Sequence, residues 1–179
     1  LAAAQGEGVL IKNVIPEHLE AFIAKMLEMG VELDVREDSI YVPKTGKLSP
    51  VNIKTAPYPS FATDLQQPIT PLLGMIDGTS MIYETIYPER TRHVPELNKL
   101  GMNIDADTYG EIAVHKSGEL HGTTVAAEEI RAGAALMIAG LMADGVTEVT
   151  NAEHVLRGYD RLVHKLTMLN ADIQIEDDF

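Results

Sequence analysis

Cysteine is absent from the 179 residues, and so is any long apolar run. Without cysteine the chain forms no disulfide and offers no thiolate to a metal ion, which favours a cytoplasmic protein. No stretch approaches the roughly eighteen consecutive apolar residues of a membrane-spanning helix, and no secretory apolar segment opens the chain. The sequence therefore predicts a soluble, cytoplasmic protein that does not insert into a membrane.

Positive charge is also scarce, because 14 Lys and Arg stand against 27 Asp and Glu, for a net charge of −13. This balance argues against a broad nucleic-acid interface and against an anionic membrane surface as partner. An anionic ligand would have to be held by a few focused arginines. Phosphate-binding loops, dinucleotide glycine patterns, nucleophilic Ser motifs and metal-ligand histidine spacings do not occur either. The sequence accordingly predicts neither a cofactor nor a metal site.

What the chain does contain is an internal repeat. Gly6, Gly78 and Gly145 each follow an apolar helical tail and precede a short β-prone run. Their separations, 78−6=72 and 145−78=67, define units of roughly 70 residues. Each unit continues into a second helical pattern, which closes in Met29-Gly-Val-Glu-Leu, Leu100-Gly-Met-Asn-Ile or Leu169-Asn-Ala-Asp-Ile. The repeat indicates one architecture built three times.

Hydrophobic periodicity assigns the second unit the element order βαβαββ. Strands are predicted over 51–55, 80–85, 103–107 and 111–115, with one helix starting near Thr63 and another near 94–100. Thr63 is a candidate cap for the first helix. Pro68 and Pro71 fall inside its apolar pattern, where proline is poorly tolerated.

The third unit is predicted to repeat this order, with strands at 123–126, 146–150 and 171–175. Its first helix is predicted to bury Ile130, Ala134, Met137, Ile138 and Leu141, and its second helix Tyr159, Leu162, Val163, Leu166 and Leu169. Helices with such stripes bury one face against a sheet. The three units, about 1–45, 50–116 and 122–176, are predicted to share one core, so that 1–179 forms a single α/β domain.

The first unit is predicted to be truncated. Residues 1–5 resemble the last turn of a helix, without an initiator Met or a capping residue. Its surviving helix is predicted to carry the apolar residues Leu19, Phe22, Ile23, Met26 and Leu27. We interpret the chain as a piece of a longer enzyme, so that some active-site groups lie outside it.

Charged residues recur at matched positions of the repeat. His18, Arg90 and Arg157 stand twelve residues after the three glycines, and Asp64 and Arg131 stand fourteen residues before the second and third. Asp64 lies at a predicted helix start, where the helix dipole favours an acidic residue with or without a function. The arginines lie at predicted helix starts too, where the dipole disfavours a cation but a guanidinium makes a receptor for phosphate or carboxylate. A single arginine of this kind is most often a surface ion-pair partner, and the matched positions favour a site.

Six ordered runs resemble the family of UDP-N-acetylglucosamine enolpyruvyl transferases. The runs are Ala62-Thr-Asp-Leu-Gln-Gln-Pro, Thr85-Ile-Tyr-Pro-Glu-Arg, His93-Val-Pro-Glu-Leu, Ile130-Arg-Ala-Gly-Ala-Ala-Leu, Ala139-Gly-Leu-Met-Ala-Asp-Gly and Arg157-Gly-Tyr. The resemblance implies two inside-out α/β domains, each of three βαβαββ units related by pseudo-threefold symmetry, with the active site between them. This chain would be one domain. The other domain, which in the family supplies a loop with a Cys or Asp general acid and a Lys-Asn pair, would be absent.

The resemblance also implies the reaction and the roles of residues. The family transfers the enolpyruvyl group of phosphoenolpyruvate to the 3-hydroxyl of UDP-N-acetylglucosamine, the first committed step of peptidoglycan synthesis, and so serves cell shape and division. Asp64 matches the aspartate that takes the hydroxyl proton, and Arg131 and Arg157 match arginines that engage phosphoenolpyruvate. Asp64 and Arg157 are thus the implied catalytic residues. The implied substrate-binding set is Asp64, Ile86, Tyr87, Arg90, Arg131 and Arg157.

Two departures from the family pattern concern the support of these arginines. Leu156 stands where the family commonly has Asp before Arg-Gly-Tyr, and Glu128-Glu129-Ile130 replaces Asp-Leu before Arg131. These departures bear on the residues around Arg131 and Arg157 more than on the assignment of the two arginines itself.

Three other readings remain open. The shikimate-pathway enolpyruvyl transferase typically shows Lys-Glu-Ser-Asp-Arg, whereas residues 157–161 here are Arg-Gly-Tyr-Asp-Arg. The RNA 3′-terminal phosphate cyclase shares the repeat but would need a catalytic His and a more basic face. A repeat domain that only binds a sugar nucleotide or a partner protein would need no base at all.

Overall fold

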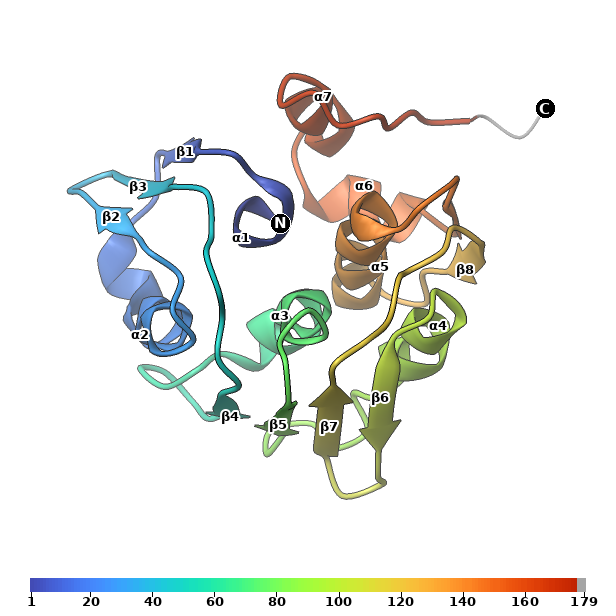
Figure 1. Ribbon diagram of the computed structural model, residues 1–179, viewed down its shortest axis with the longest axis horizontal. Helices are drawn as coiled ribbons and strands as arrows, with labels where there is room; N and C mark the ends of the chain where they lie inside the picture. The colour runs from blue at the N-terminus through green and yellow to red at the C-terminus, as the bar shows by residue number, and fades with distance from the viewer. Residues whose placement is uncertain (177–179) are drawn as a thin grey trace.

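The computed structural model describes residues 1–176, in which helices lie at the centre and three small sheets lie around them (Figure 1). The first unit contains α1 (Ala2–Gln5), β1 (Val9–Lys12), the 3₁₀ helix η1 (Pro16–Leu19), α2 (Glu20–Glu28), β2 (Asp34–Val35) and β3 (Ser39–Val42). Its strands pair antiparallel in the order β1-β3-β2.

The second unit is complete and has the predicted order βαβαββ. It contains β4 (Asn52–Lys54), η2 (Thr63–Leu65), α3 (Gln66–Leu73), β5 (Thr79–Tyr83), α4 (His93–Lys99), β6 (Asn103–Ala106) and β7 (Glu111–His115). The strand order is β4-β5-β7-β6, with β4 parallel to β5 and the other pairs antiparallel. β1, β3 and β2 are therefore the counterparts of β5, β7 and β6, so the first two units share one strand order.

The third unit is shorter than predicted. It contains β8 (Thr124–Ala126), α5 (Ile130–Met142), β9 (Glu148–Thr150), α6 (Glu153–Gly158) and α7 (Leu162–Thr167), with β8 parallel to β9. The strand predicted at 171–175 is wrong, because 171–176 adopts no regular structure. In the second unit β7 lies between the equivalent strands, and the described part of the third unit contains no such strand. An extended segment without a neighbour has no ladder of hydrogen bonds to stabilise it.

The second helix of the third unit is interrupted, although the sequence pattern predicted one continuous helix. α6 ends at Gly158, and α7 begins after Arg161, whose φ of 46° lies in the left-handed region. In Figure 1, α7 stands away from the other helices, and none of its residues is buried. Even so, Gly30, Gly101 and Asn170 follow α2, α4 and α7 with φ of 97°, 97° and 63°, so all three helices end on a left-handed residue.

The core lies between the central helices and the inner faces of the sheets. α3 packs against α5 (Figure 1). The chain continues from α3 into β5 and from α5 into β9. α3 tolerates Pro68 because the first turn of a helix has no acceptor for its N–H groups. Pro71 lies in the helix interior and is buried. Thr63 does not cap α3. It opens η2, a single 3₁₀ turn before that helix.

The predicted buried face of α5 is wrong. Ile130, Ala134, Met137, Ile138 and Leu141 are only partly buried, whereas the buried residues are Ala132, Gly133, Ala135, Leu136 and Ala139. α5 is apolar almost all round, so its periodicity carries little directional information. Small residues allow the close approach of its neighbours: a Cβ on Gly133 would overlap the Val155 side chain of α6. No helix within residues 1–176 is long and apolar enough to cross a membrane.

Candidate active site

Three of the predicted site residues meet around the carboxylate of Asp64. Asp64 lies in η2, Arg90 in the loop between β5 and α4, and Arg131 is the second residue of α5. Asp64 Oδ1 lies 2.6 Å from Arg131 Nε and 3.3 Å from Arg90 Nη1. The Asp64 side chain is 60% exposed, so the cluster is open to a ligand. The matched repeat positions thus bring these three charges together on one face.

The two arginines determine the ionisation of Asp64. The hydrogen bond from Arg131 is the largest cause of a lowered Asp64 pKa, and the charges of Arg131 and Arg90 act in the same direction against partial burial. Asp64 in turn raises the pKa of Arg131. The carboxylate is therefore ionised at neutral pH and can accept a proton, although both guanidinium groups that could bind an anion now contact it.

Arg90 is held on two sides. Its Nη1 donates to Thr63 Oγ1 at 2.9 Å, and its guanidinium carbon lies 4.1 Å from the centre of the Tyr87 ring. A guanidinium over an aromatic face is attracted by the ring quadrupole. Tyr87 is exposed, so it presents one face to Arg90 while remaining accessible, and the neighbouring Ile86 is half-buried. Both therefore border the cluster.

Arg131 is supported by a residue that departs from the family pattern. Glu129 Oε2 lies 3.5 Å from Arg131 Nη1, and Glu129 Oε1 accepts a 2.7 Å hydrogen bond from Gln67 Nε2 of the buried face of α3. Glu128 points elsewhere and pairs with Arg92 at 3.5 Å. Glu129 is thus a local partner of Arg131, at one of the positions where the sequence departs from the family pattern.

Arg157 does not join the cluster. It lies in the last turn of α6, not at a helix start as predicted, and its side chain contacts His154 Nδ1 at 2.9 Å and the Glu153 carbonyl at 3.3 Å. Within residues 1–176 it makes no hydrogen bond or ion pair with Asp64 or Arg131. His18, at the matched position of the first unit, is exposed and makes no side-chain hydrogen bond in the described part of the chain.

Tyr159 reaches the cluster from the same run as Arg157, although the sequence pattern marked it only as part of an apolar stripe. It is half-buried, and burial is the main reason for its raised pKa. The charges of Arg131 and Asp64 also act on its hydroxyl, in opposite directions. The phenol therefore lies within the electrostatic range of both charges.

Glu84 is the functional candidate that sequence reasoning missed. It follows β5 at the strand's end, is 1% exposed, and accepts hydrogen bonds from Thr55, Thr63, and the backbone of Ile86 and Tyr87. A signal was present: Ser80 and Ile82 of β5 point inward, and strand alternation directs Glu84 the same way. A carboxylate at an inward position is rare enough to mark a site.

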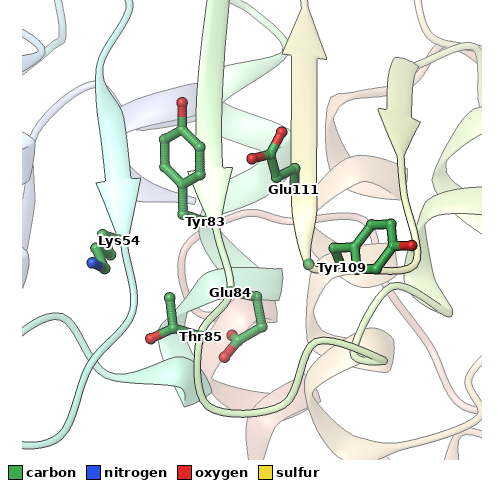
Figure 2. Close-up of a pocket in the computed structure, with 7 residues that line it drawn as sticks. Lys54, Tyr83, Glu84, Thr85, Tyr109 and Glu111 are labelled. Atoms are coloured by element: carbon green, nitrogen blue, oxygen red, sulfur yellow. The ribbon is translucent and has the colours of Figure 1, made fainter.

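An open cavity borders this network. It has a volume of about 410 Å³ and is lined by Lys54, Tyr83, Glu84, Thr85, Tyr109, Gly110 and Glu111. Figure 2 shows Tyr83 and Glu111 pointing together to one side of the sheet, away from Thr85 and Glu84. Opposite charges line this pocket, so it presents no unified charge to a ligand. Among residues 1–176 no group of three His, Asp or Glu side chains is arranged to bind a metal ion.

Comparison with known proteins identifies the family of the chain. A family profile described as EPSP synthase (3-phosphoshikimate 1-carboxyvinyltransferase) matches residues 1–166, and the chain belongs to this family of enolpyruvyl transferases. The enolpyruvyl transferase NikO from Streptomyces tendae superposes with a TM-score of 0.86 at 29% identity, over 94% of this chain and 40% of that one. EPSP synthase from Acinetobacter baumannii shares the fold at a TM-score of 0.65 and 17% identity, over 89% of this chain and 40% of that one. The family and the inside-out α/β fold predicted from the six sequence runs are thereby confirmed.

Curated relatives with higher sequence identity have a more specific name. UDP-N-acetylglucosamine 1-carboxyvinyltransferase 2 of Lactiplantibacillus plantarum is 56% identical over 178 residues, covering 99% of this chain. UDP-N-acetylglucosamine 1-carboxyvinyltransferase 1 of Streptococcus agalactiae is 53% identical over the same length and share. The chain spans 42% of the length of each of these relatives.

Proposed function

We propose that the protein to which this chain contributes transfers the enolpyruvyl group of phosphoenolpyruvate to the 3-hydroxyl of UDP-N-acetylglucosamine and releases phosphate. The names of relatives at 53–56% identity support UDP-N-acetylglucosamine as the acceptor of a 1-carboxyvinyl group. The step would belong to peptidoglycan synthesis in the cytoplasm, and through it to cell shape and division. The remaining length of such a protein would supply the second domain and the acid that protonates phosphoenolpyruvate.

The observation that carries the proposal is the contact of Asp64 with two guanidinium groups. In the proposed reaction the Asp64 carboxylate takes the proton of the 3-hydroxyl, and the oxygen forms a bond to C2 of phosphoenolpyruvate while C3 gains a proton from the other domain. Loss of a proton from C3 and of phosphate from C2 then yields the enolpyruvyl ether. Arg131 at 2.6 Å from the base would place the substrate anion next to the reacting hydroxyl.

The arginines fit the charges of this reaction. Phosphoenolpyruvate and the tetrahedral intermediate carry both carboxylate and phosphate, which planar, permanently charged guanidinium groups bind in a bidentate manner. Arg131 and Arg90 would have to exchange Asp64 for the substrate anion, and Arg157, exposed on α6, would reach the anion from a second side. Ile86 through its backbone and Tyr87 through its ring would border the sugar nucleotide.

The test is phosphate release by the full-length protein given phosphoenolpyruvate and UDP-N-acetylglucosamine. We expect turnover with this pair, and background release from the isolated 179 residues, which contain no partner domain. Shikimate 3-phosphate in place of the sugar nucleotide is the matched control. Turnover with shikimate 3-phosphate alone would overturn the substrate assignment, and calorimetric binding of UDP-N-acetylglucosamine without turnover would favour a binding domain that is not catalytic.

The second candidate is transfer to shikimate 3-phosphate. The description of the matching family profile and the fold of the Acinetobacter baumannii enzyme favour it. The run Arg157-Gly-Tyr-Asp-Arg speaks against it, because Lys-Glu-Ser-Asp-Arg is typical of that enzyme.

A further inference from the structure

The buried carboxylate of Glu84 accepts four hydrogen bonds. Its Oε1 accepts hydrogen bonds from Thr55 Oγ1 at 2.8 Å and from the backbone N–H groups of Ile86 at 2.8 Å and Tyr87 at 3.0 Å. Its Oε2 accepts one from Thr63 Oγ1 at 2.8 Å. One carboxylate therefore joins the end of β5, the loop after it, and the turn before α3.

All four donors to Glu84 are neutral. No Lys, Arg or His forms an ion pair with it among the described residues, so desolvation of its charge is opposed by hydrogen bonds alone. A glutamine of the same shape could keep the three bonds to Oε1 without any charge. The difference between carboxylate and amide lies at Oε2, where only an acceptor allows the Thr63 hydroxyl to donate.

The direction of that Thr63 hydrogen bond matters for the cluster. Because the hydroxyl donates its one hydrogen to Glu84, its lone pairs are free to accept from Arg90 Nη1 at 2.9 Å. The same Nη1 lies 3.3 Å from Asp64 Oδ1. An amide N–H at Oε2 would instead donate to Thr63 and turn its hydrogen towards the guanidinium.

We propose that Glu84 is a positioning residue that couples the loop bearing Ile86 and Tyr87 to the Asp64 base through Thr63 and Arg90. The proposal rests on the proposed function, in which this loop borders the sugar nucleotide and Asp64 takes its proton. Glu84 itself touches no reacting atom. Its role is to fix the position of the loop that borders the substrate relative to the Asp64 carboxylate, so that the bound 3-hydroxyl lies within reach of the base.

Thr63 provides the sharpest pair of variants, measured in the full-length protein. Thr63→Val keeps the shape and removes the hydroxyl, whereas Thr63→Ser keeps the hydroxyl and removes a methyl group. We expect kcat to fall roughly 10- to 100-fold in Thr63→Val, because small displacements at a reacting centre have effects of this size. Thr63→Ser should restore kcat to within a few-fold of wild type. A role in packing alone would give the opposite order and would overturn the proposal.

Glu84→Gln tests the charge itself, with Ser80→Ala as the control. Ser80 lies on the same face of β5, is equally buried, and accepts a 3.2 Å hydrogen bond from the Val51 N–H. Both variants lose a buried hydrogen bond, so both should lower the melting temperature. Only Glu84→Gln should lower kcat, with little change in the KM for UDP-N-acetylglucosamine. A kcat that follows the loss of stability equally in both variants would contradict the coupling.

Two readouts do not depend on turnover, so they separate this proposal from the proposed function. Amide hydrogen exchange at Ile86 and Tyr87 should become faster in Glu84→Ala and stay slow in Thr63→Val. Carboxyl-carbon NMR should show a small rise of the Asp64 pKa in Thr63→Val but not in Thr63→Ser, because the variant disturbs Arg90 and leaves the stronger hydrogen bond from Arg131 in place. If wild type were inactive on these substrates while both readouts held, the function would fail and the coupling would stand. If neither readout changed, the coupling would fail whatever the substrate.

Discussion

The second and third units have similar sequence patterns but different structures. In the second unit β6 and β7 complete a four-stranded sheet, and α4 packs against β6 with Val94 and Leu97 buried. In the third unit two strands form the whole sheet, and the matched helix α7 buries no residue. Leu97 and Leu166 stand at equivalent positions, 69 residues apart as are Leu100 and Leu169, yet Leu97 is fully buried and Leu166 only partly.

The difference shows what an apolar stripe can and cannot predict. A stripe makes burial favourable, but burial requires a second surface, and for a helix of this fold that surface is a sheet. The same holds for charge. Arg90 is held by Thr63, Asp64 and the Tyr87 ring of its own unit. The equivalent Arg157 forms side-chain hydrogen bonds, within residues 1–176, only with the helix that carries it. Four predictions test this comparison.

The largest effect is expected at Asp64, whose carboxylate pairs with Arg131 of the third unit. Asp64→Asn keeps the size of the side chain but removes the proton acceptor, so kcat of the full-length protein should fall about 10²–10⁴-fold. The KM for the sugar nucleotide should change less. Asp77→Asn, which alters an exposed carboxylate 3.7 Å from Lys116, is the control. An Asp64→Asn enzyme within a few-fold of wild type would exclude Asp64 as the base.

Matched leucines measure how unequally the two units are packed. Leu97→Ala removes a fully buried side chain and should lower the free energy of unfolding by about 2–5 kcal/mol. Leu166→Ala removes a partly exposed one and should cost about 1 kcal/mol or less. Urea unfolding of both variants provides the comparison. Equal losses would mean that α7 is buried in solution and that the units do not differ.

Buried His93 gives the second unit a pH dependence that the third should not share. Burial lowers the pKa of His93 from 6.5 to about 4. The unfolded chain therefore binds more protons between these values, and stability is complete above pH 6.5 and lost as pH falls towards 4. The loss is on the order of 3 kcal/mol. The third unit has Leu162 at the matched position.

His93→Leu copies the third unit into the second and provides the measurement. Both ring nitrogens of His93 are without hydrogen-bond partners, so the variant should be at least as stable at pH 7. Between pH 6.5 and 4 its free energy of unfolding should depend less on pH than that of wild type. An unchanged dependence would show that other groups, and not His93, bind the protons.

The smallest effect is expected for the two matched arginines. Arg90→Ala removes an ion pair and a cation–π contact and should lower stability by about 1 kcal/mol. Arg157→Ala should change stability by less than about 0.5 kcal/mol, because its side chain is exposed. In the full-length protein Arg157→Lys should raise the KM for phosphoenolpyruvate, since an ammonium cannot form the bidentate fork. A large stability loss in Arg157→Ala would mean that it is held as firmly as Arg90.

Local signals were sufficient for the second unit of the fold. Alternation and turn glycines act over a few residues, so β5, β6 and β7 could be predicted to within two residues at each end. The segment 171–175 has the same alternation, but a strand depends on a neighbour that the alternation does not describe. The buried face of α5 was wrong for a related reason, because a helix apolar on all sides does not state which side meets α3.

The site shows the same limit. Asp64, Arg90 and Arg131 could be predicted because matched positions near helix starts converge when units repeat around one centre. Arg157 could not be placed, since α6 begins four residues before it and moves it from the start of a helix to the end. Glu84 was recognisable as inward-pointing from β5, but only the contact with Thr63, 21 residues away, shows what its charge does.

The placement of helices inside and sheets outside has a consequence for how the chain reaches this structure. Strand pairs join residues close in sequence, such as Thr79 and His115, 36 positions apart, whereas the central contacts join distant ones, such as Asp64 and Arg131, 67 positions apart. Shorter loops close at a lower entropic cost, so the strand ladders can form before the central helices pack together. Substitutions along β5 and β7 should therefore slow folding, while those between α3 and α5 should chiefly speed unfolding. The periphery of this domain would set its rate of assembly, and the centre its lifetime.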